Sequence, residues 1–502
     1  MSKLVANIIG RRPKNLQRSD LLNFIKEHEL KRITFHYTAG DGRLKELILP
    51  INSMDYAERV LAAGERVDGS SLFKGMVGTA SSDLYVVPVY ATAFINPFDS
   101  KSINFICRFL NKNEELAEFC PDNILKHASD TLFKTHGFEL WALGELEFYL
   151  IGKQEHDQYP MEFQSGYHTS APYSRYMDIV KEMLEHISDI TGKVKYGHSE
   201  VGVIHNIVSE DLTVNGKYAE QFEIEFLPAP IESAADYMTL AKWVVRNVAY
   251  KYDLLATFAP KIEEGYAGTG LHFHLELLEN NKNIMTKDNG DLSDISKKAI
   301  GGLLKFAPSL TAFGNTVASS YLRLVPNQES PTKLFWSDLN RSALVRVPLG
   351  WKKSEDMASK INHRLKDIYK SPFKRQTIEL RSADGSAFIH LLLGGITIAI
   401  QWGLDSPDDA LVISKKCYVN KSAHSKIKDL ASLPPSCAIS ANLLQENMYL
   451  YEKQIPKNIL EWVILKLKAQ NDETLISEIE SMEQKDKALR RRSLMHKVLH
   501  IG

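Results

Sequence analysis

Two glutamates lie two positions apart in a segment typical of a β-strand. Glu145 and Glu147 occur in the run Gly-Glu-Leu-Glu-Phe-Tyr-Leu. Residues two apart on a strand point to the same face, so these carboxylates would lie side by side. Like charges this close repel each other unless a proton or a cation separates them. The pair therefore indicates either an exposed strand face or a cation site.

Two histidines repeat the same spacing. His272 and His274 occur in Gly-Thr-Gly-Leu-His-Phe-His-Leu, so both imidazoles would project from one side of an apolar strand. This arrangement fits either a structural role or metal ligation. The preceding Gly268 and Gly270 would let the backbone come close to a ligand. Their spacing matches neither common glycine-rich phosphate-binding motif.

Further acidic side chains lie in apolar surroundings elsewhere in the chain. Glu200 and Glu223 are two of these, and Glu379 is another. Arg381 follows Glu379 on the same face of a predicted strand, a spacing that also fits a simple ion pair. Acid-rich sites with few histidines favour hard cations such as Mg²⁺ or Mn²⁺ over zinc.

Three arginines add a complementary charge. Arg323 lies in Ser-Ser-Tyr-Leu-Arg-Leu-Val-Pro, and Arg341 and Arg346 lie in Asn-Arg-Ser-Ala-Leu-Val-Arg-Val-Pro. Each arginine alone fits a surface ion pair. Guanidinium groups bind phosphate and carboxylate through two points. Beside divalent cations they provide the charge neutralisation and positioning that phosphoryl transfer from ATP requires. The combination, rather than any single residue, predicts a cation-dependent enzyme that uses ATP.

The elements that must position these groups form two regions. Strands and turns dominate up to about residue 108, after a predicted helix over 20–30, and include strands over 32–37 and 44–50. From about residue 113, predicted helices such as 121–135 and 177–191 alternate with strands such as 139–150. We therefore expect an α+β protein, with an N-terminal domain over 1–112 and a larger domain over 113–502.

The composition excludes several classes of partner. The chain of 502 residues carries 61 basic and 62 acidic residues, so it lacks the basic excess typical of nucleic-acid or membrane-surface binding. Its four cysteines are far apart, which favours a reducing compartment. The first 15 residues lack the order of a signal peptide. The most apolar stretch, 387–404, contains polar residues and predicts a buried core helix. These features predict a cytoplasmic protein.

Three segments look peripheral. Residues 209–219 and 352–371 are predicted to be surface additions. The chain from about residue 453 predicts charged amphipathic helices, and its basic run 490–492 predicts a solvated helix face.

The spacing and order of these motifs resemble those of glutamine synthetases, from about residue 30 to about residue 450. The motifs that carry the resemblance are Asp68-Gly-Ser-Ser71, Glu145-x-Glu147, Glu200, Gln221-Phe-Glu223, Gly268-x-Gly270-x-His272-x-His274, Arg323-Leu-Val-Pro-x-x-Glu329-x-Pro331, Asn340-Arg341-Ser-Ala343 with Arg346, and Glu379-x-Arg381.

The resemblance implies a small β-grasp N-terminal domain and a large catalytic domain built on a curved antiparallel sheet. It also implies a homo-oligomer of hexameric rings, commonly two stacked as a dodecamer. The active site would lie between neighbouring subunits, with the loop of Asp68 reaching into the next subunit's site.

Roles for individual residues follow from the same resemblance. It implies two or more Mg²⁺ or Mn²⁺ ions per site, one held by Glu145, His272 and Glu379 and the second by Glu147, Glu200 and Glu223. Glu225 is an alternative to Glu223 as a ligand of the second ion. The resemblance further implies substrate contacts from Gly268, Arg323 and Arg381, nucleotide contacts from His274 and Arg346, and catalytic roles for Asp68, Glu329 and Arg341.

The implied reaction has two steps. ATP phosphorylates the side-chain carboxylate of glutamate, and ammonia then attacks the resulting acyl phosphate, while flap closure excludes water. Three positions depart from the family pattern. Ala267 replaces an asparagine that helps to bind the amino acid substrate, Glu276 replaces a serine near the nucleotide, and Thr377 replaces a basic residue.

Two alternatives remain open. Ala267 favours a γ-glutamyl-amine ligase that uses a polyamine or another amine, whereas Asp68 and Glu329 favour ammonia. A non-catalytic structural relative should have lost metal ligands, but all six are present in this chain.

Overall fold

The computed structural model describes residues 2–78, 82–154, 158–325, 330–350, 356–367, 369, 375–420 and 427–501. The N-terminal part contains a sheet in the order β2-β1-β6-β4-β3, with β5 paired to β6. Strands β1 and β6 are parallel, and the other pairs are antiparallel. The strands are β1 (Arg32–Thr38), β2 (Leu44–Pro50), β3 (Glu65–Asp68), β4 (Asp83–Pro88), β5 (Phe94–Asn96) and β6 (Asp99–Leu110).

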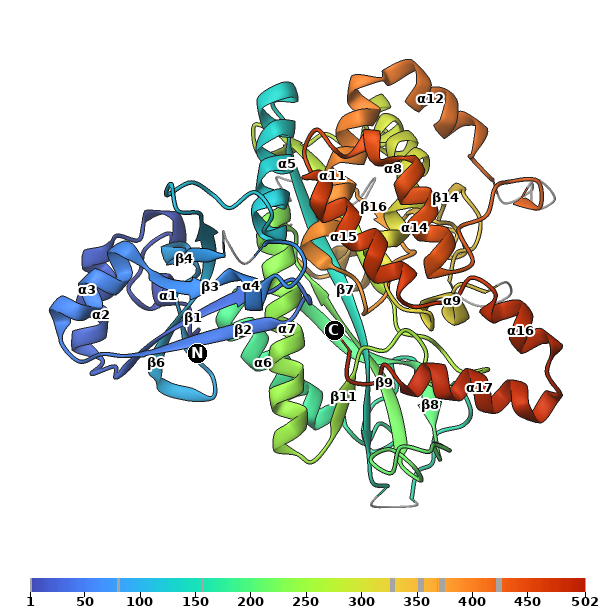
Figure 1. Cartoon of the computed structure of the whole chain (residues 1–502), viewed down its shortest axis with the longest axis horizontal. Coiled ribbons are helices and arrows are strands. Elements are labelled where there is room, and N and C mark those ends of the chain that lie inside the picture. Colours follow the sequence, from blue (N-terminus) through green and yellow to red (C-terminus); the bar gives the residue numbers. More distant parts are fainter. Residues whose placement is uncertain are drawn as a thin grey trace.

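Short helices accompany this sheet, which lies at the left of Figure 1. Ser53 caps α3 by accepting a hydrogen bond from the backbone N–H of Tyr56, and α2 and α3 pack against each other. The helical segments are α1 (Val5–Ile8), η1 (Pro13–Asn15), α2 (Arg18–Glu27), α3 (Met54–Ala63), α4 (Gly69–Leu72) and η3 (Tyr90–Thr92). The predicted strand-rich N-terminal region is confirmed.

A second, larger sheet forms the centre of the remaining chain. Its strands run in the order β14-β15-β16-β12-β7-β9-β8, while β10 and β11 pair with β7 and β13 pairs with β12. All neighbours are antiparallel except β14 and β15. The strands are β7 (Glu139–Gly152), β8 (Val194–Ile204), β9 (Tyr218–Phe226), β10 (Ala229–Pro230), β11 (Leu255–Thr257), β12 (Leu271–Glu279), β13 (Lys282–Asn283), β14 (Trp336–Asp338), β15 (Val345–Val347) and β16 (Ile378–Leu380).

Helices pack beside this sheet and against one another (Figure 1), and α11 contacts α5, α7 and α8. The helices are α5 (Pro121–His136), α6 (Met177–Thr191), α7 (Ile231–Lys251), α8 (Asp294–Gly314), α9 (Ser320–Arg323), α10 (Ala358–Ile361), α11 (Ile389–Asp405), α12 (Pro407–Lys416), α14 (Cys437–Glu446), η4 (Met448–Leu450), α15 (Lys457–Lys468), α16 (Leu475–Ser481) and α17 (Gln484–His496).

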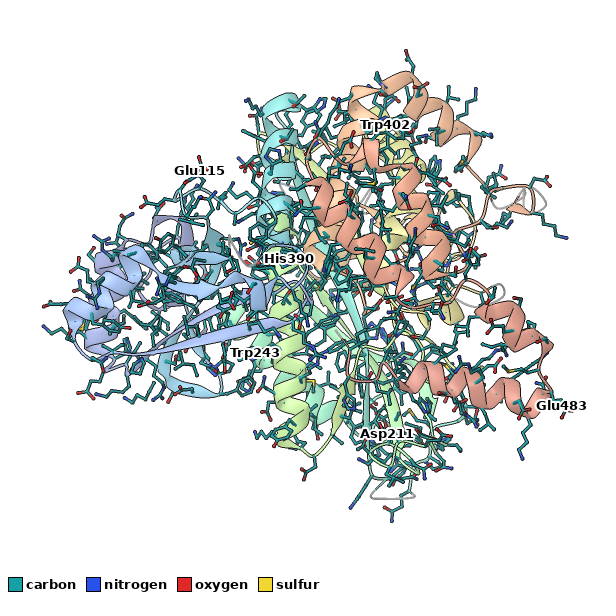
Figure 2. The ribbon with its side chains drawn as sticks, viewed as in Figure 1. Glu115, Asp211, Trp243, His390, Trp402 and Glu483 are labelled. Atoms are coloured by element: carbon teal, nitrogen blue, oxygen red, sulfur yellow. The ribbon has the colours of Figure 1, made fainter. Side chains whose placement is uncertain are left out.

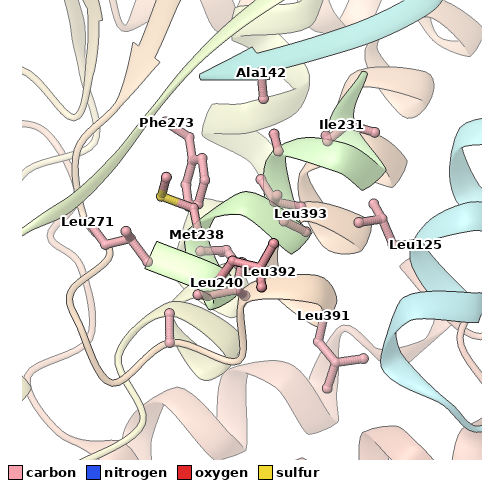
Figure 3. Packing of buried hydrophobic residues seen from close by; sticks show 14 of the residues in the cluster. Leu125, Ala142, Ile231, Met238, Leu240, Leu271, Phe273, Leu391, Leu392 and Leu393 are labelled. Carbon is pink, nitrogen blue, oxygen red and sulfur yellow. The ribbon is translucent and has the colours of Figure 1, made fainter. Parts of the chain in front are cut away.

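The alternation of residue types along β12 separates the two faces of the large sheet. Leu271 and Phe273 are fully buried on the face that packs against α7 and α11 (Figure 3). On β7, Gly144 points to the same side, where an added Cβ would lie 2.4 Å from the sulfur of Met238. A side chain at this position would push α7 away from the sheet. The polar residues between these positions point to the opposite face.

Buried polar groups join the N-terminal part to the helices. Arg108 of β6 donates to Asp236 of α7 over 2.6 Å, and His390 of α11 lies 3.1 Å from the same carboxylate. His36 of β1 lies with its ring centroid 5.2 Å from that of Trp243. Figure 2 labels Trp243 and His390, which lie between the N-terminal sheet and the remainder of the chain. Because charges this deep are costly unless paired, these contacts fix the two parts relative to each other.

The most apolar stretch forms the predicted core helix, α11, whose first 13 residues are all buried. Among the described residues, no helix is both long and apolar enough to cross a membrane. One peripheral assignment is partly wrong. Strand β9 begins inside the predicted surface segment 209–219, and its Tyr218 and Ala219 are buried. Only part of segment 352–371 lies within the described residues.

The basic run near the C-terminus also differs from the prediction of a solvated face. Arg492 donates to the carboxylate of Glu263 over 2.9 Å, and Arg491 pairs with Glu264. These ion pairs hold α17 against the segment that precedes Gly268. Helix α15 likewise contributes buried residues to the core, because Leu460 and Val463 are fully buried.

Candidate active site

A cavity of about 1660 Å³ lies on the polar face of the large sheet. Alternate residues of strands β7, β8, β9 and β12 line this cavity, because successive side chains of a strand point to opposite faces of the sheet. These residues are Trp141, Leu143, Glu145 and Glu147 of β7, Glu223 and Glu225 of β9, His272, His274 and Glu276 of β12, and Tyr196, His198 and Glu200 of β8.

Glu145 lies at the centre of this face. Its Oε2 is 2.8 Å from Nδ1 of His272, and its Oε1 is 2.8 Å from Nε2 of His274. The strand register places His272 directly opposite Glu145. Burial favours a higher pKa for the Glu145 carboxyl, but the two imidazoles outweigh burial and hold this pKa well below its usual range. This carboxylate is therefore ionised and available as a ligand.

Glu147 is bound by groups that surround the glycine motif. Its Oε2 accepts a hydrogen bond from the backbone N–H of Gly270 over 2.7 Å and another from Nε2 of Gln221 over 3.1 Å. A Cβ at position 270 would lie 2.5 Å from Nε2 of His272 and 2.9 Å from Nη2 of Arg323. Glycine is needed here because the backbone passes directly between charged side chains.

Glu200 and Glu223 form a second acidic cluster with His198. Ligand atoms of these three residues all lie within 4.8 Å of one another. Burial, together with the charges of Glu147 and Glu223, raises the pKa of Glu200 to about 8. Burial and the charges of Glu145 and Glu147 raise the pKa of Glu223 well above its usual value. Without a cation, these carboxyls hold protons because their negative charges repel one another.

Glu225 of β9 lies opposite Glu145 of β7, whereas Glu223, two positions earlier, lies opposite Glu147. Lys195 binds its Oε1 over 2.6 Å, and the ligand atoms of Glu225, Glu145 and His274 also lie within 4.8 Å of one another. Glu223 is near both His272 and Glu200, whereas Glu225 has a lysine partner. The geometry therefore favours Glu223 over Glu225 as the cation ligand, because Glu223 belongs to the groups of both His272 and Glu200.

Glu379 is fully buried between two arginines. Arg346 donates to its Oε2 over 2.8 Å, and Arg381 binds its Oε1. His272 lies within 3.9 Å of the same carboxylate. Glu379 therefore forms the expected ion pair with Arg381 and also approaches the imidazole of His272, as the family resemblance implied.

The remaining arginines line the same cavity. Arg323 donates to the carbonyl of Ser382 over 2.9 Å, and its other terminal nitrogen lies 3.5 Å from Nε2 of His272. Because a guanidinium can only donate, this ring nitrogen accepts, and Nδ1 of His272 carries the proton that faces Glu145. Arg341 is exposed at the cavity wall, and Gly268 lies beside Arg323.

One predicted catalytic residue, Asp68, lies outside the described lining of the cavity in its own chain. Asp68 is exposed at the end of β3, where it accepts hydrogen bonds from the side chains of Ser70 and Ser71 over 2.7 and 2.6 Å. These bonds lower its pKa to about 2. Asp68 is not among the described residues that line the cavity of its own chain. Glu329 lies outside the described residues.

The structure adds cavity residues to which sequence reasoning assigned no role. His198 precedes Glu200 by two positions on one strand, so the same alternation that paired Glu145 with Glu147 could have found it. Lys195 and Tyr167 also line the cavity. Tyr167 lies in an irregular segment, where no periodic signal was available.

The donor set fits divalent cations. Carboxylates predominate, imidazoles are few, and several carboxyls have raised pKa values that a cation would lower. Two further acids, Glu147 and Glu379, lie within 4 Å of the imidazole of His272. These groups could hold two cations, which would supply charge neutralisation for the phosphates of a nucleotide.

The fold combines a small N-terminal sheet with a larger sheet, and the cavity on the larger sheet is lined by acids, imidazoles and arginines that fit divalent cations. Residues 118–486 match the family model "Glutamine synthetase, catalytic domain", and residues 29–112 match "Glutamine synthetase, beta-Grasp domain". The chain belongs to the glutamine synthetase family, and the predicted β-grasp and catalytic domains are confirmed.

Individual relatives agree with this assignment. The glutamine synthetase of Sulfolobus acidocaldarius is 28% identical over 390 residues, which cover 72% of this chain and 78% of that protein. The structure of Plasmodium falciparum glutamine synthetase is similar with a TM-score of 0.72 and 20% identity, over 94% of this chain and 98% of that one. Apo GmaS gives a TM-score of 0.70 and 19% identity, over 95% and 99%. These two structures establish similarity of fold alone.

Proposed function

We propose that this chain is an ATP-dependent ligase that joins ammonia to the γ-carboxylate of glutamate, giving glutamine through γ-glutamyl phosphate. The observation that carries this proposal is the convergence of Glu145, His272 and Glu379 in one buried site beside three arginines. Phosphoryl transfer to a carboxylate needs such a concentration of positive charge, because both reactants are anions.

The geometry supports a division of the ligands between two cations. Glu145, His272 and Glu379 would hold the ion at the nucleotide phosphates, and Glu147, Glu200 and Glu223 would hold the ion near the acceptor carboxylate. Both ions would be Mg²⁺ or Mn²⁺. When bound, they supply the charge neutralisation that lets two anions approach.

The arginines and neighbouring groups would bind the organic substrates. Arg346 contacts Glu379, so it is positioned for the phosphate end of ATP, with His274 nearby and Arg341 at the exposed wall. Arg323 and Gly268 lie together and would bind the α-carboxylate and α-amino end of glutamate. Arg381 would help to neutralise the transferred phosphoryl group.

The proposal includes a homo-oligomer. Asp68 is ionised and exposed on the N-terminal sheet, but it does not line the described part of its own cavity. In hexameric rings of subunits, stacked as a dodecamer, Asp68 would enter a neighbour's cavity and take up a proton from ammonium, with Glu329 closing the site. We also propose a domain division near residues 112 and 113, and a cytoplasmic location.

A second candidate function is a γ-glutamyl-amine ligase. Ala267 lies in the cavity wall beside Gly268, where an asparagine would bind the amino acid substrate, and Tyr167 and Tyr266 line the same cavity. A non-catalytic role is disfavoured because the donor set is retained.

The test is phosphate release from ATP with glutamate present, measured over ammonium, methylamine and a polyamine, with Mg²⁺ and then Mn²⁺. We expect release to require glutamate, a cation and an amine, with ammonium giving the highest kcat/KM. A polyamine or methylamine that exceeds ammonium by a wide margin would establish the second candidate. No amine-dependent release with either cation would contradict both.

A further inference from the structure

We propose that His198 is a further ligand of the second cation, and that this site therefore binds Mn²⁺ in preference to Mg²⁺. This inference rests on the proposed function, because it concerns one of the two cation sites assigned above. It adds an imidazole nitrogen to a site whose other expected ligands, Glu147, Glu200 and Glu223, are all carboxylates.

His198 occupies a cavity-facing position of β8. The register places it directly opposite Glu223, and its Nε2 lies 3.2 Å from Oε1 of that residue. Its Nδ1 lies 3.8 Å from Oε1 of Glu200. The imidazole is thus as close to this pair of acids as His272 is to Glu147 and Glu379 in the first cluster.

The hydrogen bond of the other ring nitrogen determines which nitrogen can bind a cation. Nδ1 of His198 lies 3.0 Å from the backbone carbonyl oxygen of Ser199. A carbonyl oxygen only accepts, so Nδ1 carries the proton. In a neutral imidazole, the lone pair then lies on Nε2, the nitrogen that faces Glu223. Metal-binding histidines commonly donate their second N–H to a backbone carbonyl in this way.

Two acceptors that face each other over 3.2 Å need a proton or a cation between them. A proton on either His198 or Glu223 would satisfy this contact, and a metal ion would satisfy it by ligation. Ligation is favoured because Glu200 and Glu223 both lie close enough to share one ion with this nitrogen. The experiment below separates these two alternatives.

Neighbouring aromatic side chains hold the ring in position. The ring centroid of His198 lies 4.1 Å from that of His168, and Tyr167 packs edge-on at 5.5 Å. The side chain is 11% exposed. Because these contacts restrict the ring, its nitrogen is positioned before a cation arrives, which lowers the entropic cost of binding.

An imidazole ligand changes the choice of metal. Mg²⁺ prefers oxygen ligands and retains its water, whereas transition metals accept nitrogen more readily. A site with one nitrogen and carboxylate oxygens should therefore select Mn²⁺ over Mg²⁺. Replacement of His198 by glutamine should reduce this selectivity, because the amide offers oxygen in place of nitrogen.

The test is pulsed electron paramagnetic resonance of the full-length protein loaded with two Mn²⁺ per chain, which needs no turnover. The variants are His272→Gln, which removes the imidazole of the first site, and His272→Gln combined with His198→Gln. We expect ¹⁴N modulation to persist in the single variant and to disappear in the double variant. Absence of modulation in the single variant, or equal modulation in both, would overturn the role of His198.

Calorimetric titration provides an independent measurement if His272→Gln does not fold. His198→Gln should lose about tenfold or more in Mn²⁺ affinity at one site, the scale expected when a metal site loses a supporting group, and should change little in Mg²⁺ affinity. His205→Gln, which changes an exposed histidine just beyond the end of β8, is the matched control and should retain the wild-type preference. Equal losses for both metals would contradict the inference. If the wild type bound no divalent cation at all, the proposed function itself would fail.

Discussion

Nδ1 of His272 lies 2.8 Å from Oε2 of Glu145, although 127 positions separate these residues in the chain. The antiparallel pairing of β7 with β12 creates this contact, because it places the two residues directly opposite each other. The same pairing positions His274 near Glu145 and Gly270 against Glu147. One strand register therefore assembles most of the proposed cation site.

Loss of the buried charge of Glu379 should destabilise the fold as well as prevent ATP turnover. Glu379→Gln leaves Arg346 and Arg381 without their anionic partner in a fully buried position. We expect a loss of about 3–5 kcal/mol in the free energy of unfolding, measured by urea denaturation in the presence of chelator.

Glu264→Gln is the matched control for this change, because it removes the half-exposed partner of Arg491. The loss in the free energy of unfolding for Glu264→Gln should stay below about 1 kcal/mol. An equal loss in the free energy of unfolding for the two variants would contradict the conclusion that Glu379 neutralises the charges of two buried guanidinium groups.

A methyl group at position 270 should weaken cation binding. In Gly270→Ala, the new Cβ would crowd Nε2 of His272 and the guanidinium of Arg323, so these groups must move apart. We expect at least a tenfold loss in Mn²⁺ affinity by calorimetry, the scale of a disturbed metal site. Gly78→Ala, with no heavy atom of the described residues within 4 Å of the added group, should retain wild-type affinity. Wild-type binding by Gly270→Ala would show that the cation lies elsewhere.

His36 should make the stability of the protein depend on pH. Burial lowers its pKa to about 4, and within the described structure its Nδ1 has no hydrogen-bond partner. A base with a lowered pKa in the folded state contributes stability above its unfolded pKa of about 6.5, and this contribution disappears as the pH falls towards 4. We expect a loss of about 3 kcal/mol between pH 7 and pH 4 that is absent in His36→Gln.

Urea denaturation across this pH range measures the effect. His28→Gln changes an exposed histidine of the same domain and should keep the wild-type pH profile. If His36→Gln had the same profile as the wild type, protonation of His36 would not be linked to unfolding.

Ala267→Asn tests the departure from the family pattern at the substrate end of the cavity. The backbone oxygen of Ala267 accepts a hydrogen bond from Tyr149 over 2.8 Å, which holds this position in place. An asparagine here could add one hydrogen bond to bound glutamate. We expect KM for glutamate to fall about fivefold, equivalent to about 1 kcal/mol, with little change in kcat. An unchanged KM with an altered order of amine preference would instead place this residue at the acceptor site.

Sequence periodicity predicted which side chains share a strand face. The pairs Glu145 with Glu147 and His272 with His274 needed only the period of two. The register between strands could not be predicted from these patterns, because it depends on contacts across more than one hundred residues. The approach of His272 to Glu145 and Glu379 therefore rested on family resemblance alone.

Prediction from sequence failed or was incomplete for residues whose environment depends on tertiary contacts. Arg491 and Arg492 were expected to be solvated, but their partners Glu264 and Glu263 lie far away in sequence. His198 was overlooked, although its spacing of two from Glu200 on β8 matches the spacing of Glu145 and Glu147. The role that we propose for Asp68 needs a second copy of the chain, which a single subunit does not contain.

The most direct test of the proposed chemistry follows an oxygen atom. If ATP phosphorylates the γ-carboxylate and the amine then displaces phosphate, one carboxylate oxygen must leave with that phosphate. With glutamate labelled by ¹⁸O in its γ-carboxylate, mass spectrometry should find one ¹⁸O atom in each phosphate released during amide formation. Amide formation with unlabelled phosphate would contradict an acyl phosphate intermediate at this site.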